Sequence, residues 1–205
     1  VLGPVPAFVP NALPLDWVTV GAIGEGQLSV IVREGVPAQK IINGKQSFVA
    51  ANPTRATLLA TPYLSWAWNM EAQEKGPHPV RLTIGFYGGH PDSQNQEDVP
   101  ARKKAELPAH DRAIVLVWSL SALERGSITL PETTGDRQPA ARYSVRGGRE
   151  NTGSWWFETL DLSDLYRRAW PNDNAGRTKI TFIGFAAAPG KKPSTAHISG
   201  LRLSR

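Results

Sequence analysis

The segment PYLSWAWNM, residues 62–70, decides the fold class of this chain. Leu64, Trp66, Trp68 and Met70 alternate with smaller or polar residues, and side chains two positions apart in a strand lie on the same face. One face of this strand therefore belongs in a hydrophobic core, and the other lies near solvent.

A second run, VRLTIGFY at residues 80–87, alternates in the same way. The residues between the two runs, 74–79, include Gly and Pro, which are typical of turns. The two runs are therefore predicted to form a β-hairpin.

Strand patterns recur along the rest of the chain with Gly and Pro between them. Only short segments look helical: residues 163–169, with Asp161 or Ser163 as the N-cap and Pro171 soon after the end, and residues 120–124. The strand spacings are those of a sandwich or a barrel, and we therefore expect an all-β chain, an antiparallel β-sandwich, forming a single domain over residues 17–205. The further strands are predicted at residues 28–33, 47–51, 113–120, 127–130, 141–145, 155–160, 179–187 and 196–203.

Residues 1–16 are predicted to form an extended, Pro-rich arm, because Pro at this density blocks both helix and central strand. An extended segment has no interior of its own, so its apolar side chains must lie against this sandwich or against another protein. These side chains are Val5, Phe8, Val9 and Leu13.

The composition excludes several classes of protein. The 205 residues contain no Cys, which rules out disulfides and thiolate metal sites, and no apolar stretch reaches the roughly 20 residues of a membrane-spanning helix. The pI is about 9.7, but acidic residues interrupt the basic ones, which favours a solvated surface over a nucleic-acid site. Because the chain begins at Val1, without Met, we expect signal-peptide removal and a periplasmic or secreted location.

Catalytic and metal-binding patterns are absent from the sequence. There is no G-x-S-x-G pentapeptide and no phosphate-binding Gly-rich loop. The four histidines lie far apart, although His90 and His110 bracket a long polar loop at residues 88–111 that is either functional or mobile. Glu71, Glu158 and Asp161 are the acids available for glycoside hydrolysis, and each has a simpler structural role. We therefore predict no enzymatic activity, no metal and no cofactor.

The aromatic residues are the most distinctive feature. Seven Trp occur in 205 residues, and Trp155, Trp156 and Phe157 are consecutive. If Trp155 and Phe157 enter the core, Trp156 points outward, where a flat ring can stack on a sugar or on a partner protein. Alternatively the N-terminal arm or the helix that follows covers Trp156. Trp170, at the end of that helix, is the second candidate for this aromatic platform.

The order of these segments resembles a bacterial exported family described as domain of unknown function 3047. The matching segments are PYLSWAWNM, VRLTIGFYG, AIVLVWS, SWWFETLDLSDLYRRAW, ITFIGFAAAP and TAHISGLRL, and the resemblance covers residues 28–203. That family tends to carry acidic segments where this chain has QEKGPHPV, residues 73–80, and AAPGKKPS, residues 187–194. The resemblance implies a jelly-roll sandwich similar to carbohydrate-binding modules, without naming a ligand.

Two functions fit these features. The first is a non-catalytic exported accessory subunit, which binds and stabilises a larger periplasmic or membrane-bound enzyme through the arm and the exposed aromatics. The alternative is a glycan-binding module that uses Trp156 or Trp170 as a stacking platform. A jelly-roll enzyme is a weaker third hypothesis, because the sequence shows no clustered acids.

Overall fold

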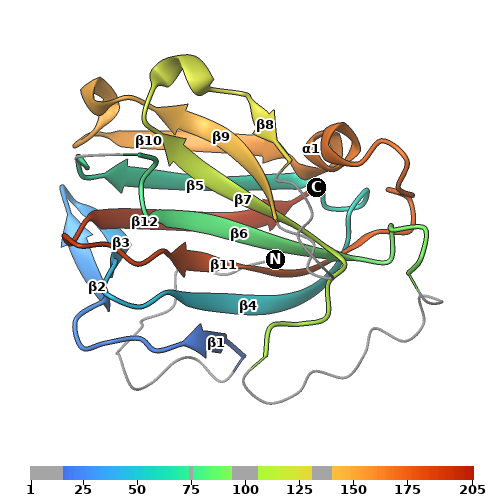
Figure 1. The fold of residues 1–205 in the computed structure, drawn as a ribbon, viewed down its shortest axis with the longest axis horizontal. Coiled ribbons are helices and arrows are strands. Elements are labelled where there is room, and N and C mark those ends of the chain that lie inside the picture. The colour runs from blue at the N-terminus through green and yellow to red at the C-terminus, as the bar shows by residue number, and fades with distance from the viewer. Residues whose placement is uncertain (1–15, 74–75, 94–105, 131–139) are drawn as a thin grey trace.

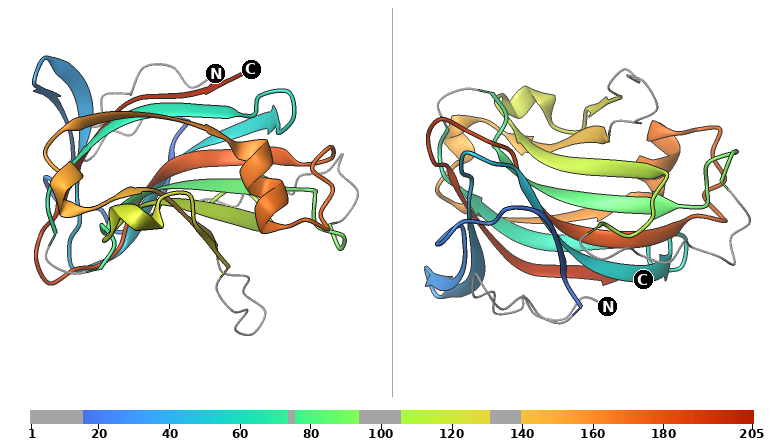
Figure 2. Two further views of the ribbon diagram at one scale, coloured as in Figure 1. Left: turned by 90° about the horizontal axis from the view of Figure 1, so that it is seen from above. Right: turned by 60° about the horizontal axis from the view of Figure 1, so that its bottom comes forward.

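The computed structural model describes residues 16–73, 76–93, 106–130 and 140–205 of the chain. Two β-sheets lie face to face as two layers, with one α-helix at one end (Figure 1, Figure 2). The predicted all-β sandwich is confirmed. The apolar side chains assigned to the arm, Val5, Phe8, Val9 and Leu13, lie outside the described residues, as does the middle of the long loop, residues 94–105.

The seven-stranded sheet has the order β1 (Val18–Gly21), β4 (Phe48–Thr57), β11 (Lys179–Ala187), β6 (Val80–Tyr87), β7 (Arg112–Ser119), β9 (Ala141–Gly147) and β8 (Ile128–Thr129). The five-stranded sheet has the order β10 (Trp155–Asp161), β5 (Tyr63–Met70), β12 (Thr195–Ser204), β3 (Val36–Ile42) and β2 (Leu28–Arg33). One pair departs from the predicted antiparallel arrangement, because β9 runs parallel to β7. A parallel pair needs a long crossover, which residues 120–140 supply.

The core confirms the alternation predicted for residues 62–70. Leu64, Trp66, Trp68 and Met70 are all fully buried on β5, which lies between β10 and β12 in the five-stranded sheet. Trp68 makes an edge contact of 5.5 Å between ring centres with Trp118 of β7, which belongs to the other sheet. The tryptophans therefore join the two layers.

The predicted hairpin of residues 62–70 and 80–87 is wrong. These residues form β5 and β6, which lie in different sheets, and the connection between them crosses from one layer to the other. Both strands have an apolar face, and these faces bury more surface when they oppose each other across the sandwich than when they lie side by side. The described residues of this connection, 71–73 and 76–79, consequently lie at one end of the sandwich.

Two strands were not predicted, β1 and β3. Residues 36–42, VPAQKII, contain Pro37 and two polar residues, so the apolar alternation is interrupted. The strand forms because Glu34 and Gly35, with φ of 53° and 79°, make a two-residue turn that folds β3 back onto β2.

The predicted short helix is present as α1 (Leu162–Ala169) and closes one end of the sandwich. Asp161 is its N-cap and accepts hydrogen bonds from the backbone N–H groups of Ser163 and Asp164, at 2.8 and 3.1 Å. The second predicted helical segment is a single 3₁₀ turn, Ala122–Glu124. No helix in the described ranges has the length and apolar character needed to cross a membrane.

Candidate functional site

Trp156 lies on the core side of β10, so its predicted outward orientation is wrong. It pairs with the buried Trp68 and packs against the core. The guanidinium carbon of Arg146 lies 3.8 Å from the centre of its ring, and its Nε1 donates a 2.8 Å hydrogen bond to the carbonyl of Asn151. Phe157 is the residue that faces outward, with 71% of its surface exposed. Among the described residues, the Arg146 guanidinium covers the Trp156 ring; the arm lies outside the described part of the chain.

Trp170 is half-buried as well. Its ring contacts those of Tyr166 and Phe86, at 5.1 and 6.5 Å between ring centres, and the guanidinium of Arg112 lies 5.2 Å from it. Both Trp156 and Trp170 are half-buried, and each has an arginine guanidinium over its ring. The aromatic platform predicted from these two residues is therefore partly covered.

The acids considered for catalysis have structural partners. Glu158 is buried and accepts a 2.6 Å hydrogen bond from Nε of Arg146. Asp161 caps α1, and Glu71 lies 3.8 Å from Arg33 in an ion pair. These carboxylates do not converge on a common site.

The two histidines that bracket the long loop have different contacts. His90 Nδ1 accepts a hydrogen bond from the backbone of Asp92, and the His110 ring lies edge-on to Phe182 at 5.1 Å. Within the described ranges, no group of three His, Asp or Glu residues is arranged to hold a metal ion.

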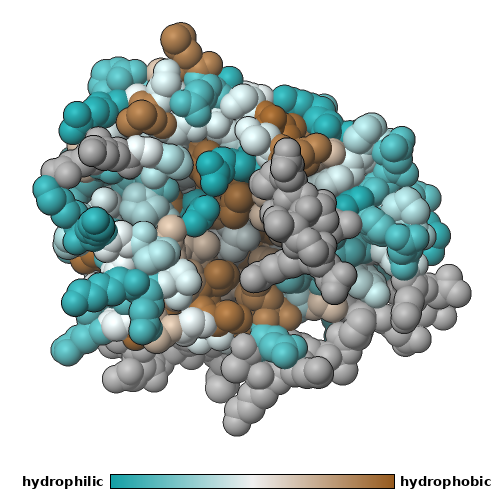
Figure 3. Space-filling view, viewed as in Figure 1, coloured by the Kyte–Doolittle hydropathy of each residue, from teal (hydrophilic) through white to brown (hydrophobic). Residues whose placement is uncertain are grey.

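The seven-stranded sheet has a distinctive outer face, which points away from the core. None of the seven strands contains Asp or Glu, whereas β6 and β9 place Arg on this face. Val18, Ala51 and Phe182 form a small apolar cluster there, separate from the main core. Figure 3 shows apolar surface in the middle of this face, with hydrophilic residues beside it. The outer face is therefore apolar with a basic margin.

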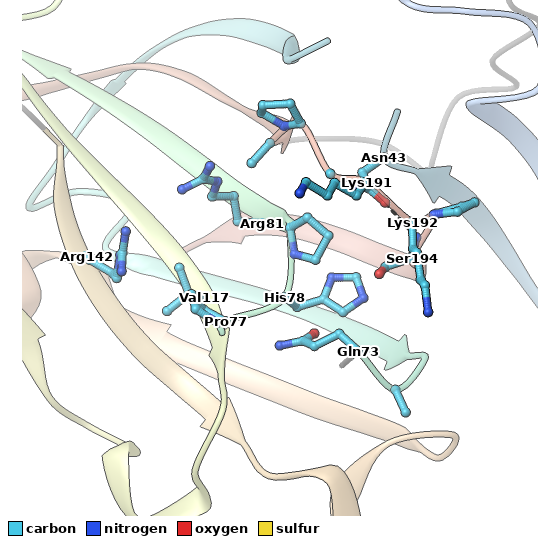
Figure 4. A pocket seen from close by; sticks show the side chains of 16 residues that line it. Asn43, Gln73, Pro77, His78, Arg81, Val117, Arg142, Lys191, Lys192 and Ser194 are labelled. Atoms are coloured by element: carbon cyan, nitrogen blue, oxygen red, sulfur yellow. Dashed lines mark hydrogen bonds between the residues drawn. The ribbon is translucent and has the colours of Figure 1, made fainter. Parts of the chain in front are cut away.

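An open cavity of about 750 Å³ lies where β6 begins and β11 ends (Figure 4). Its walls come from two connections, between β5 and β6 and between β11 and β12, together with Asn43. The outer face contributes Arg81 from β6, Val117 from β7 and Arg142 from β9. Segments distant in the sequence therefore meet at this end of the sandwich.

Two arginines dominate the charge of the cavity. Arg81 is half-buried and Arg142 is exposed, and they project from strands on either side of β7. Burial, and secondarily the charge of Arg142, lowers the pKa of Arg81. Among the described residues, neither guanidinium has an acidic partner or a hydrogen bond. Within that described part of the chain, the cavity thus holds two positive charges close together without a neutralising carboxylate.

His78 and Asn43 add neutral hydrogen-bond donors. Burial lowers the pKa of His78 to about 4, so the ring is neutral at pH 7. Its Nδ1 accepts a 3.1 Å hydrogen bond from the N–H of Val80, which places the proton on Nε2. Nε2 of His78 and Nδ2 of Asn43 are both buried without a hydrogen-bond partner among the described residues.

The burial of His78 makes stability depend on pH. Its pKa falls from 6.5 to about 4 on folding, so between these values the unfolded chain binds more protons. Stability is therefore complete above pH 6.5 and falls by about 3 kcal/mol as the pH drops to 4. In urea titrations, His78→Asn, which keeps an acceptor for Val80, is expected to flatten this slope. An unchanged slope in the variant would show that other groups cause it.

Comparison with known proteins identifies the class of fold. No protein-family model matches the chain, and no curated protein matches its sequence. The sandwich is of the jelly-roll type found in a family 12 glycoside hydrolase.

A family 12 glycoside hydrolase, from a study of thermal stability, is similar with a TM-score of 0.52 and 9% identity, over 99% of this chain and 96% of that one. The family 11 carbohydrate-binding module of the Clostridium thermocellum cellulase Lic26A-Cel5E has a TM-score of 0.41 and 10% identity, over 100% and 95%. Endoglucanase 3 of Trichoderma harzianum, from family 12, has a TM-score of 0.42 and 10% identity, over 93% and 100%. These likenesses concern the fold alone.

Sequence reasoning missed the cavity residues. Arg81 was assigned to the polar side of its strand, and Arg142 was not singled out. The available signal was that both arginines occupy outward positions, on strands without a single acid. Their proximity depends on the parallel placement of β9 beside β7, which the alternation pattern does not reveal.

Proposed function

We propose that this chain is a non-catalytic glycan-binding module and that the cavity at the end of the seven-stranded sheet is its binding site. The cavity itself carries this proposal. Its volume of about 750 Å³ lies within the range of small-ligand sites, roughly 300–1,000 Å³. Apolar side chains and hydrogen-bond donors share its lining, and a saccharide has apolar C–H faces and hydroxyl oxygens to match them.

The walls of the cavity are held in place by hydrogen bonds. The backbone of Ser194 donates to Oδ1 of Asn43 at 2.6 Å, and the N–H of Gly190 donates to the carbonyl of Gly44 at 2.9 Å. The N–H of Ala188 donates to the carbonyl of Pro79, also at 2.9 Å. The β11–β12 connection is thereby tied to the residues that follow β3 and to the β5–β6 connection, and a preformed site loses less entropy on binding.

The charge of the cavity argues for binding without hydrolysis. Most glycosidases need two carboxyl groups, one on each side of the scissile bond. Among the described residues that line the cavity there is no Asp or Glu. A saccharide bound there would meet hydrogen-bond donors but no general acid or nucleophile of this kind.

The accessory-subunit hypothesis stays a prediction. Its two supports were the arm, whose apolar residues lie outside the described part of the chain, and an aromatic platform, whose residues are half-buried. No feature of the described residues favours it over glycan binding.

A binding assay with a cavity-blocking variant tests the proposal. We expect the purified protein to bind at least one oligosaccharide on a glycan array and to release no reducing ends from it. Ala188→Trp, which places an indole in the cavity, is expected to weaken that binding at least about tenfold, because it displaces the ligand. Isothermal titration calorimetry with the same oligosaccharide gives the dissociation constants.

The control for this variant is Ala67→Trp, which adds the same side chain to β5 of the other sheet, beside the exposed Phe157. It should bind like the unaltered protein, and thermal unfolding checks that both variants fold. Absence of binding to every glycan, or equal affinity in Ala188→Trp and the unaltered protein, would refute the proposal. Release of reducing ends would make the protein a hydrolase instead.

A further inference from the structure

The charges of the cavity suggest which kind of saccharide it takes. Four side chains of its lining are basic, Arg81, Arg142, Lys191 and Lys192, and among the described residues none is acidic. In Figure 4 the side chains of Arg81 and Lys191 extend toward the same region, and Arg142 approaches from the β9 side of β7. A cavity with this charge attracts an anion and repels a cation.

Arg81 and Arg142 are placed to bind one ligand together. Val115 of β7 pairs with Arg142, and Arg81 lies beside Val117 on the other side of the same strand. Only β7 separates the two strands, so β6 and β9 lie two inter-strand spacings, roughly 10 Å, apart. Two like charges on these strands repel each other when no described carboxylate lies between them, and a bound anion would relieve the repulsion.

The neutral groups of the cavity favour the same ligand. The amide nitrogen of Asn43 and the Nε2–H of His78 are hydrogen-bond donors, both buried and both unpartnered among the described residues. A buried donor without an acceptor costs free energy. A ligand rich in acceptors would remove this cost by accepting hydrogen bonds from both groups. Carboxylate and sulfate groups offer only acceptors, and they accept two parallel hydrogen bonds from an arginine.

The cavity contains no Trp, Tyr or Phe among its described lining residues, and the one aromatic ring in that lining, the imidazole of His78, is buried. Stacking on a ring, which serves both neutral sugars and nucleic-acid bases, is therefore not available in it. Recognition must depend on charge and hydrogen bonds, and recognition by charge favours an anionic saccharide over a neutral one.

We propose that the cavity binds an anionic saccharide, whose carboxylate or sulfate group is held between Arg81 and Arg142 while Asn43 and His78 donate to its oxygens. This inference rests on the glycan-binding function proposed above and names its ligand class. Arginine is suited to the role because its planar guanidinium matches both anionic groups in geometry.

The test compares matched ligands by calorimetry at low and physiological ionic strength. The probes are a galacturonic-acid tetramer, the same tetramer after reduction of its carboxyl groups, a heparin tetrasaccharide and cellotetraose. We expect binding of the galacturonate or the heparin oligomer that weakens as salt is added, and no binding of the carboxyl-reduced or neutral ones. Preference between the first two identifies carboxylate or sulfate as the group recognised.

Charge-removing variants then locate the site. Arg81→Gln and Arg142→Gln are each expected to weaken binding of the anionic oligomer about tenfold or more, since each loses a hydrogen bond to a charged group. Arg202→Gln removes the same charge from the exposed surface of β12, in the other sheet, and should bind normally. Thermal unfolding and circular dichroism confirm that the variants fold.

The outcomes separate this inference from the function on which it rests. Binding of a neutral glycan but of no anionic one refutes the inference and leaves glycan binding intact. Equal losses in Arg202→Gln and Arg81→Gln would mean unspecific attraction, which also refutes it. Equal affinity for single-stranded DNA would show a general polyanion site and refute saccharide recognition. No binding of any glycan refutes both proposals.

Discussion

Replacing Asp173 with alanine is expected to lower the free energy of unfolding by about 3–5 kcal/mol, because it leaves the charged guanidinium of Arg112 buried without its carboxylate partner. The Asp173 side chain is only 2% exposed and that of Arg112 only 12%. Nε and Nη2 of Arg112 donate to the two carboxylate oxygens at 2.8 and 3.0 Å, and the Tyr166 hydroxyl donates to one of them at 2.9 Å. Burial alone would raise the pKa of Asp173, but these hydrogen bonds lower it, so the group is ionised.

Urea denaturation of the variant measures this loss. Asp92→Ala is the matched control, because the Asp92 side chain is 91% exposed and its removal should change stability by less than about 0.5 kcal/mol. The double variant Asp173→Ala, Arg112→Met should recover part of the lost unfolding free energy, since it also removes the charge of Arg112. A cost below about 1 kcal/mol for Asp173→Ala would show that the Arg112–Asp173 ion pair does not stabilise the contact between β7 and the end of the sandwich that carries α1.

How far the sequence predicts this fold depends on which residues are considered. The alternation in β5 and β6 correctly separates core from surface, because side chains two apart must share a face. It fails at Trp155, Trp156 and Phe157, where three large residues in a row are compatible with either orientation. The structure turns Trp156 inward.

The acid that follows explains why this choice could not be made from the sequence. Glu158 shares the inward face of β10, which is unfavourable for a carboxylate unless it has a partner. Arg146 supplies that partner from β9, an edge region of the other sheet, and covers the Trp156 ring as well. Local pattern cannot show a contact between two sheets, so the inward position of Glu158 was not foreseen.

The same limitation applies to the cavity. Its two walls are segments that the sequence analysis had singled out separately: residues 74–79 as the turn of a hairpin, and residues 187–194 as a place where the resembling family carries an acidic segment. They meet because β5 and β6 lie in different sheets, which brings the connection at residues 71–79 beside the connection at residues 188–194. Because the sequence analysis paired residues 62–70 with residues 80–87 in a hairpin, it could not predict that these two connections form one cavity.

The role of the tryptophans in joining the sheets gives the second large prediction. Trp68→Ala is expected to lower the free energy of unfolding by about 3–5 kcal/mol, as is usual when a buried aromatic is truncated. The ring is fully buried and meets Trp66 and Trp118 edge-on, at 5.4 and 5.5 Å between ring centres. Trp68→Phe should cost much less, because it keeps an aromatic ring and removes a buried Nε1–H that has no hydrogen-bond partner among the described residues.

Guanidinium denaturation followed by circular dichroism compares these variants with Phe157→Ala, which truncates an exposed aromatic of the same sheet. The exposed site should change stability by less than about 1 kcal/mol, because little apolar surface is buried there. If Trp68→Ala and Phe157→Ala cost the same, the tryptophan contact between the layers is not what stabilises the sandwich. If Trp68→Phe costs as much as Trp68→Ala, the indole shape itself is required, and the unpartnered Nε1–H is a minor cost beside the loss of packing.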